Sequence, residues 1–221
     1  MPADPGIAII DYGMGNLRSV AKALGSLGLE CEVTGDPERL GRARRAILPG
    51  VGAFGDAMEE LHSRGLVPAL RELAASGRPL LGICLGMQLL MESSEESPAT
   101  AGLGLVPGRV RRFDPEALGP LKSPHMGWNR VRRAAGGDWP LLMSIPDGEY
   151  FYFVHSFYVE PAPGAAGQVA VTTHGVEFVS ALSRANLYAT QFHPEKSQRA
   201  GLRLLANFAS LDPTRVSMGC P

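Results

Sequence analysis

The first candidate for chemistry is Cys84, the central residue of the motif G-I-C-L-G over residues 82–86. An apolar run precedes it and a helical pattern follows, so the cysteine occupies a predicted strand-to-helix turn. Glycines suit both flanks, because a Cβ would clash where the strand and the helix approach closely. The sulfur would lie at the carboxyl edge of a sheet, beside helix N–H groups that favour a thiolate. The motif predicts a thiol nucleophile, with the N–H of Leu85 as an oxyanion donor; a buried structural cysteine is the alternative.

A thiol nucleophile needs a base and a group that orients the base. The segment Q-F-H-P-E-K-S over residues 191–197 offers both. His193 could accept the thiol proton and later protonate a leaving amine, while Glu195 could fix the imidazole tautomer and stabilise its cation. A solvated loop carrying the same two residues is the alternative. A zinc site built on Cys84 and His193 would lack the clustered cysteines of a deaminase-type centre, so no metal ligand is predicted.

The third candidate is the glycine-rich segment P-G-V-G over residues 49–52, which follows an apolar run. Such a loop can turn backbone N–H groups toward a developing oxyanion. A phosphate cradle would need the lysine and hydroxyl of a P-loop, and neither is present. An ordinary tight turn also remains open.

These segments require a sheet that brings them together. In the first half, apolar runs that alternate with helical patterns predict strands at 7–10, 31–34, 46–48 and 80–83 and helices starting near 17, 56 and 84. In the second half, strands are predicted at 108–113, 129–133, 150–159, 168–173, 178–183 and 187–192, before a helix at 198–210. The pattern predicts an α/β fold: a doubly wound, mostly parallel sheet with helices on both faces and an antiparallel extension. We expect a single domain, 1–221, with a core of about 6–210 and a loose tail at 211–221.

Composition excludes several classes of protein. The chain has 221 residues, 45% of them hydrophobic and 19% charged, with a net charge of −1. A nearly neutral globule has no electrostatic footprint for nucleic acid or anionic lipid. Its three widely spaced cysteines suit reduced thiols in the cytoplasm. The longest apolar run, 80–91, is too short to span a bilayer. We therefore expect a cytoplasmic protein that binds neither nucleic acid nor membrane.

The motifs together resemble the class I, triad-type glutamine amidotransferases. Further motifs are D-Y-G-M-G-N at 11–16, P-G-V-G-A-F-G-D-A-M at 49–58, H-M-G-W-N at 125–129 and Y-F-V-H at 152–155. With the segment at 191–197, their order resembles the glutaminase subunits of imidazole glycerol phosphate synthases over about residues 6–210. The resemblance implies hydrolysis of glutamine to glutamate and ammonia through a cysteinyl thioester, without a cofactor. It assigns Cys84 as nucleophile, His193 as general base and acid, and Glu195 as the third member of the triad.

The resemblance also implies how the substrate is held. The 49–52 loop would be the oxyanion strand, whose Val51–Gly52 peptide must be correctly oriented to donate. The remaining substrate contacts would be made by Gly50, Gln88 and Glu96 and by the backbone of Ser156 and Phe157. Phe157 stands where relatives commonly have tyrosine, so a backbone contact would survive at this position and a hydroxyl contact would not.

A partner is implied as well. Ammonia would pass across a heterodimer interface into a cyclase subunit with a barrel fold, near Asn16, Trp128, Tyr152 and Lys196. Three other functions remain open on the sequence. They are a class I glutaminase subunit of a different biosynthetic synthase, a binding or regulatory subunit without turnover, and a stand-alone cysteine peptidase. The 125–129 and 152–155 motifs speak against the first of these, and the intact triad residues against the second.

Overall fold

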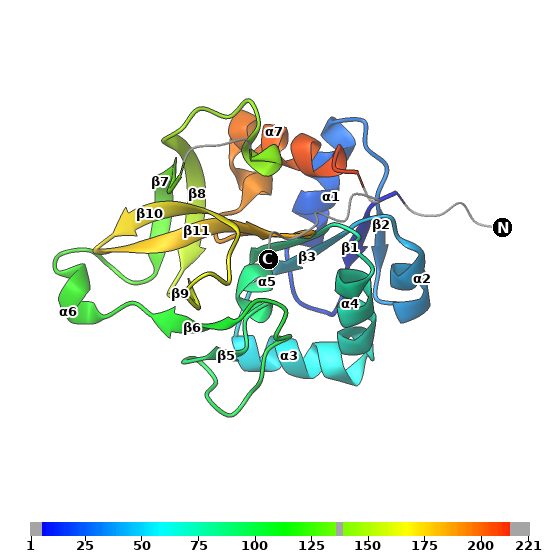
Figure 1. Ribbon diagram of the computed structural model, residues 1–221, viewed down its shortest axis with the longest axis horizontal. Coiled ribbons are helices and arrows are strands. Elements are labelled where there is room, and N and C mark those ends of the chain that lie inside the picture. Colours follow the sequence, from blue (N-terminus) through cyan, green and yellow to red (C-terminus); the bar gives the residue numbers. More distant parts are fainter. Residues whose placement is uncertain (1–5, 136–138, 213–221) are drawn as a thin grey trace.

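A single mixed sheet runs through the whole protein (Figure 1). The computed structural model describes residues 6–135 and 139–212. The strands are β1 (Ala8–Ile10), β2 (Glu32–Thr34), β3 (Ala46–Gly50), β4 (Leu80–Cys84), β5 (Ser93–Ser94), β6 (Gly108–Arg112), β7 (His125–Arg133), β8 (Glu149–His155), β9 (Phe157–Pro161), β10 (Gln168–His174), β11 (Val176–Arg184) and β12 (Leu187–Thr190). The helices are α1 (Leu17–Ser26), α2 (Pro37–Arg42), α3 (Phe54–Ser63), α4 (Leu66–Ala75), α5 (Leu85–Leu89), α6 (Pro115–Leu118) and α7 (Gln198–Ala209). The expected tail at 211–221 lies outside the described residues, apart from its first two.

The sheet has a parallel half and an antiparallel half. Strands β2, β1, β3, β4 and β12 are hydrogen-bonded in that order and all run parallel. From β12 the order continues through β11, β10, β7 and β8, and every pairing there is antiparallel. The short strands β5, β6 and β9 branch from this path, with β9 joined to β11. The predicted fold, a doubly wound sheet with an antiparallel extension, is confirmed.

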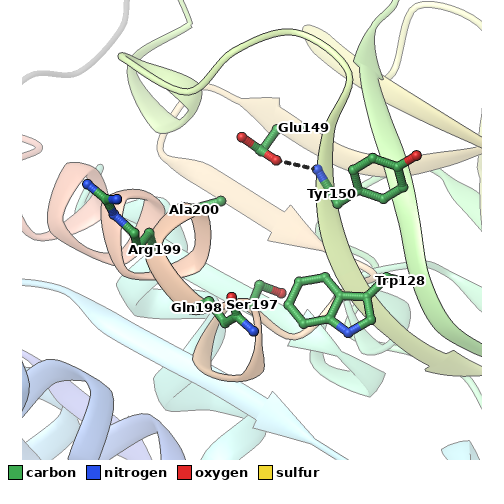
Figure 2. Close-up of a pocket in the computed structure, with 7 residues that line it drawn as sticks. All are labelled: Trp128, Glu149, Tyr150, Ser197, Gln198, Arg199 and Ala200. Atoms are coloured by element: carbon green, nitrogen blue, oxygen red, sulfur yellow. Dashed lines mark hydrogen bonds between the residues drawn. The ribbon is translucent and has the colours of Figure 1, made fainter.

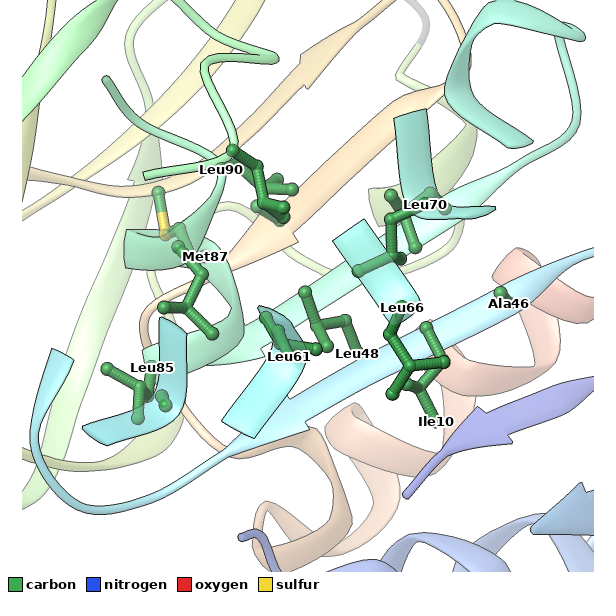
Figure 3. Packing of buried hydrophobic residues seen from close by; sticks show 14 of the residues in the cluster. Ile10, Ala46, Leu48, Leu61, Leu66, Leu70, Leu85, Met87 and Leu90 are labelled. Atoms are coloured by element: carbon green, nitrogen blue, oxygen red, sulfur yellow. The ribbon is translucent and has the colours of Figure 1, made fainter. Parts of the chain in front are cut away.

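Helices cover both faces of the parallel half (Figure 1). Successive residues of a strand point to opposite faces, so neighbours such as Ile9 and Ile10 enter different clusters. One cluster packs strand residues against α3, α4 and α5, and contains Ile10, Leu48, Leu61, Leu66, Leu70 and Met87 (Figure 3). The other packs them against α1 and α7, and contains Ile9, Ile47, Val20, Leu24, Leu204 and Phe208. This burial on both faces fixes the carboxyl ends of β3, β4 and β12.

Some predicted elements are divided in the structure. The helical stretch expected over 56–75 is two helices, because Gly65 adopts a left-handed conformation (φ 67°) between α3 and α4. The strand expected over 150–159 is interrupted at Ser156, since β8 pairs with β7 whereas β9 pairs with β6 and β11. The sequence analysis also missed α2 and α6. Each follows an aspartate that accepts an N–H bond, Asp36 or Asp114, and a proline in the first turn, which is a typical helix start.

Candidate active site

Cys84 lies at a sharp turn between β4 and α5. It is the last residue of the strand and the N-cap of the helix, with φ 55° and ψ −109°, a backbone conformation that is strained for a residue with a Cβ. Both flanking glycines are sterically required. A Cβ on Gly82 would lie 2.7 Å from the carbonyl oxygen of Gly86, and one on Gly86 would overlap the carbonyl of Leu48. The helix that follows is short, because α5 has five residues.

His193 and Glu195 form a buried pair beyond the end of β12. Nδ1 of His193 lies 2.8 Å from Oε1 of Glu195, and the two side chains are 2% and 1% exposed. Pro194 starts a 3₁₀ turn that folds the carboxylate back toward the ring. Burial by itself would lower the pKa of His193, but hydrogen bonding and charge from Cys84 and Glu195 outweigh it and raise the pKa to about 9. The imidazole is therefore held as its cation at neutral pH.

The free nitrogen of the ring faces no competing partner. Nε2 of His193 is buried and has no well-formed hydrogen bond within the described residues, while Cys84 is near enough to raise the pKa of the ring. The second carboxylate oxygen of Glu195, Oε2, is likewise buried and unpaired there. A cysteine, an imidazole and a carboxylate thus lie together, which are the three groups that a nucleophile, its base and an orienting group require.

The glycine-rich loop lies against the cysteine turn. Gly50 is in register with Cys84 on the neighbouring parallel strand. A Cβ on Gly50 would lie 2.5 Å from the hydroxyl of Tyr12 and 2.9 Å from Cβ of Leu85, so only glycine lets the chain pass. Gly52 has φ 105°, which also favours glycine, and Val51 between them is 40% exposed. The loop therefore begins beside Cys84 and Leu85.

The residues expected to hold glutamine have partners in the free protein. Nε2 of Gln88 donates to the carbonyl oxygen of Phe157 at 3.0 Å. Oε2 of Glu96 accepts from the N–H of Phe54 at 2.8 Å and so caps the start of α3 across 42 residues of sequence. Ser156 lies in the interruption between β8 and β9, where its carbonyl accepts from Phe113 N at 3.3 Å. The structure brings Gln88 and Phe157 together and places Glu96 at the start of α3.

An exposed aromatic face adjoins this site. Trp128 and Tyr152 are paired across β7 and β8, with ring centroids 6.1 Å apart, and Trp128 is 46% exposed. Nζ of Lys196 lies 5.9 Å from the centre of the Tyr152 ring. The carbonyl of Tyr152 accepts from His193 N at 2.9 Å, so this face is joined directly to the backbone of His193. Asn16 begins α1 elsewhere on the sheet edge, next to Gly15, and its side chain makes no capping bond.

A pocket of about 380 Å³ opens on the same face (Figure 2). Trp128 and Tyr150 form one wall and the first residues of α7 form the other. Its lining residues are Trp128, Glu149, Tyr150, Ser197, Gln198, Arg199 and Ala200. Within residues 6–135 and 139–212, no group of His, Cys, Asp and Glu side chains is suited to hold a metal ion, and no helix is long and apolar enough to cross a membrane.

Comparison with known proteins decides the family. The sequence model of the family "Glutamine amidotransferase class-I" matches residues 8–210 of this chain. The imidazole glycerol phosphate synthase subunit HisH of Moorella thermoacetica is 53% identical over 205 residues, which cover 93% of this chain and 94% of that one. The chain belongs to the HisH family of class-I glutamine amidotransferases. The HisH subunit of Cyanothece sp. is 52% identical and covers 92% of this chain and 95% of its own length.

Solved structures agree with the fold of this HisH-family chain. A crystal structure of a glutamine amidotransferase superposes with a TM-score of 0.72 at 18% identity, covering 93% of this chain and all of the other. The structure of PurLQS from Thermotoga maritima gives 0.70 at 18% identity and covers 93% and 98%. At this identity the likeness shows the common fold alone.

Two buried polar residues of the HisH-family site were missed by the sequence analysis. Gln191 is fully buried, and its Nε2 lies 3.8 Å from the sulfur of Cys84; its place two residues before His193 was the available signal. Tyr12 is also fully buried, and its hydroxyl has no hydrogen-bond partner in the described chain. Burial and then the charge of Cys84 raise the pKa of Tyr12 well above its usual value. Nothing in its motif at 11–16 indicated that it would approach the nucleophile.

Proposed function

We propose that this chain is the glutaminase subunit of an imidazole glycerol phosphate synthase and that Cys84, His193 and Glu195 are its catalytic triad. The observation that carries the proposal is the buried His193–Glu195 pair beside a cysteine on a strained strand-to-helix turn. The pKa of His193 is raised to about 9, so its imidazole is protonated at neutral pH. A cation beside a cysteine favours the thiolate form. Identity of about 50% to HisH subunits over most of the chain supports the same role in histidine biosynthesis.

The geometry supports a two-step reaction. The Cys84 thiolate attacks the side-chain amide carbon of glutamine, and the oxyanion accepts hydrogen bonds from the N–H of Leu85 and from the Val51–Gly52 peptide. His193 gives its proton to the leaving nitrogen, so the C–N bond breaks and ammonia departs from a glutamyl thioester. Water then attacks the thioester while His193 takes one of its protons. The C–S bond breaks to give the thiolate and the restored imidazolium, and the new carboxyl group loses the remaining proton to solvent as glutamate is released.

Hydrogen bonds within the protein indicate which atoms remain to contact the substrate. Both protons of the Gln88 amide nitrogen are used by Phe157 and Gln191, which leaves Oε1 to accept from the substrate. One carboxylate oxygen of Glu96 accepts from the N–H of Phe54. The other can bind the α-ammonium group of glutamine. Gly50 and the backbone of Ser156 and Phe157 complete the proposed site. A backbone contact at Phe157 needs no hydroxyl.

The proposed partner is a barrel-shaped cyclase subunit in a heterodimer. Ammonia released into neutral water would be protonated and no longer nucleophilic, so it must pass directly to the acceptor. The face carrying Trp128, Tyr152 and Lys196 supports this docking position, because it is exposed, aromatic and joined to His193 through the Tyr152 carbonyl. Asn16 is assigned to the edge of the same interface. Gly52, whose φ of 105° leaves its peptide free of side-chain restriction, suits a loop whose oxyanion donors are oriented when the partner docks.

The deciding experiment measures glutamate formed from glutamine by the purified chain, alone and with the cyclase subunit and its ligand. We expect low activity alone and a rise on the order of a hundredfold with the ligand-loaded cyclase. The Cys84→Ala variant should bind the cyclase normally and form no glutamate, while added ammonium salts should still support the cyclase. Activity that ignores the cyclase would contradict the proposed partner. Absence of activity with both proteins folded and associated would contradict the glutaminase itself.

A further inference from the structure

A chain of hydrogen bonds leads from Cys84 into the protein through Gln191, Gln88 and Phe157. Gln191 spans its first link: Nε2 lies 3.8 Å from the sulfur of Cys84, and Oε1 accepts from Gln88 Nε2 at 3.1 Å. The side chain has no exposed surface, and its own N–H is fixed to the carbonyl of Ser180 at 2.8 Å. A buried amide with both ends in use cannot rotate without leaving polar groups unpaired. Gln191 therefore presents a fixed N–H donor to the sulfur.

The second link is the carbonyl oxygen of Phe157. It accepts from Gln88 Nε2 at 3.0 Å and from Nδ1 of His155 at 2.8 Å. His155 is in turn joined through Nε2 to Nδ1 of His125 at 3.0 Å. Both histidines are buried, and no step of the glutaminase reaction uses them. The hydrogen bond from His155 fixes the position of the Phe157 carbonyl, and that carbonyl in turn fixes the side chain of Gln88.

The direction of every bond in this chain is determined. Asn129 accepts from the N–H of Arg130 at 2.8 Å and donates from Nδ2 to the carbonyl of Thr173 at 3.0 Å, which fixes its amide orientation. Its nitrogen therefore donates to Nε2 of His125 at 3.1 Å. Nδ1–H of His125 must then donate to His155, and Nδ1–H of His155 to the carbonyl of Phe157. Each histidine carries one proton, and a second proton on either would place two donors face to face.

We propose that Gln191 is a further catalytic residue, whose amide N–H binds the Cys84 thiolate, and that His125 and His155 are positioning residues that hold it in place through Phe157 and Gln88. The inference rests on the proposed glutaminase function and deepens it. The present distance of 3.8 Å is long for a donor, and it shortens as negative charge gathers on sulfur, because charge-assisted bonds are shorter and stronger. The same bond weakens when sulfur becomes neutral in the thioester. Gln191 thus stabilises the sulfur in its two anionic states, which are the attacking thiolate of the first step and the departing thiolate of the second.

Other groups around the histidines are compatible with this arrangement. His174 stacks on His125 with centroids 4.1 Å apart, and His193 adds a further positive charge near His155. Both oppose protonation of the pair. Burial, the larger effect, lowers the pKa of His125 to about 4 and that of His155 to about 3. His125 and His155 are therefore both neutral at neutral pH.

The first test replaces Gln191 by glutamate in the complex with the cyclase subunit. Glu is nearly isosteric and can still accept from Gln88, but it removes the donor to sulfur. We expect kcat for glutamine to fall about 10- to 100-fold, the effect of losing one charge-assisted hydrogen bond, with less than a threefold change in KM. The rate of Cys84 alkylation by iodoacetamide, followed on the Cys84 peptide by mass spectrometry, should reach its plateau at higher pH than in the wild type.

A matched control makes the same chemical change at Gln168. Gln168 is in register with Ser183 of β11, which pairs with Tyr188 of β12. Tyr188 pairs with Leu81, the second residue of β4, whereas Cys84 is the last residue of that strand. The Gln168→Glu variant should keep the wild-type kcat and alkylation profile. A Gln191→Glu variant with kcat within twofold of the wild type and an unchanged alkylation profile would overturn the catalytic role. If Gln191→Glu does not fold, Gln191→Met, which also lacks a donor, serves for the same two measurements.

The second test separates positioning from simple packing. His155→Phe keeps a ring in the aromatic cluster and removes the donor to Phe157, so KM for glutamine should rise about tenfold, and the pH at which Cys84 alkylation reaches its plateau should rise by less than in Gln191→Glu. His155→Gln can again donate to Phe157 and should recover most of the loss. Equal KM values in both variants and the wild type would overturn the positioning role. Alkylation of Cys84 requires no turnover, so a wild type that forms no glutamate would refute the proposed function while leaving the Gln191 test readable.

Discussion

Gly50 and Cys84 stand directly opposite each other on the adjacent parallel strands β3 and β4. This pairing sets the glycine-rich loop against the nucleophile before any substrate arrives. A side chain at Gly50 would collide with Tyr12 and Leu85, and Leu85 supplies the other proposed oxyanion donor. The register of two buried strands, fixed by the hydrophobic core, therefore determines how the proposed oxyanion loop lies against the proposed nucleophile.

The His193–Glu195 pair predicts the effect of neutralising the carboxylate. In Glu195→Gln the amide can present its nitrogen to Nδ1 of His193, which would favour the wrong imidazole tautomer and remove the stabilisation of the cation. We expect kcat to fall by about 10²-fold or more, as for the equivalent change in other triads, with KM for glutamine nearly unchanged. Steady-state kinetics of the cyclase complex measures both. A loss of less than threefold would show that Glu195 is not a member of the triad.

The pKa of His193 predicts a second consequence of the same variant. Hydrogen bonding and charge from Cys84 and Glu195 raise that pKa to about 9 against the effect of burial. Removing one of these partners should lower it. NMR titration of the imidazole in the wild type and in Glu195→Gln should show this decrease, and an equal or higher midpoint in the variant would contradict the assigned cause.

The cysteine turn predicts a sharp contrast between two glycines. A Cβ on Gly86 would overlap the carbonyl of Leu48, a backbone atom that cannot yield, so Gly86→Ala should cost several kcal/mol and prevent folding at 37 °C. Gly25, inside α1, has nothing within 4 Å of an added Cβ. Gly25→Ala should increase the free energy of unfolding by about 0.5–1 kcal/mol, because alanine favours helix. Urea denaturation measures both; a stable Gly86→Ala protein would contradict the close approach.

The proximity of Cys84, His193 and Glu195 could be predicted from the sequence because each lies at or just beyond the end of an apolar strand within a short motif. Parallel strands place their carboxyl ends at one edge, so Cys84 and His193 were expected to meet there although 109 residues separate them. The doubly wound core followed from the same alternation of strands and helices. Local sequence patterns therefore predict which strand or helix carries a residue and at which edge of the sheet that residue lies.

The polar network behind the nucleophile could not be found in this way. Gln88 meets Gln191 across 103 residues, and His125 meets His155 across 30, and neither contact leaves a local trace. Such pairs depend on strand register and on the break at Ser156, which ends β8 and starts β9. That break was missed because both strands are apolar and aromatic, so their periodicity continues across it. The two halves pair with different neighbours, which only the tertiary structure decides.

The unpaired hydroxyl of Tyr12 predicts an unusual response to truncation. Its burial without a hydrogen-bond partner carries a desolvation cost that phenylalanine would avoid. We expect Tyr12→Phe to leave the free energy of unfolding unchanged or to raise it by about 1 kcal/mol. Tyr150→Phe is the matched control: its exposed hydroxyl accepts from Arg130 at 2.9 Å, so its loss should cost a few tenths of a kcal/mol at most. A loss of more than about 1 kcal/mol in Tyr12→Phe would show that the hydroxyl has a partner.

The buried histidines predict that stability is greatest near pH 6–7 and declines on both sides. His193 has a folded pKa of about 9, above the ordinary 6.5, so its contribution is complete below pH 6.5 and is lost as the pH rises toward 9. His125 and His155 have folded pKa values of about 4 and 3, so the unfolded chain binds protons more readily as the pH falls below 6.5. Stability should therefore also fall between pH 6.5 and 4, by a few kcal/mol in total.

Urea denaturation from pH 4.5 to 9 under reducing conditions measures this profile. His155→Phe should flatten the acidic side, because it removes one group that is protonated only on unfolding, and it should leave the alkaline side unchanged. Exposed His62 offers the control, and His62→Gln should preserve the whole profile. The free energy of unfolding could instead decrease as steeply with falling pH in His155→Phe as in the wild type. That result would show that groups other than the buried pair bind the protons taken up on unfolding.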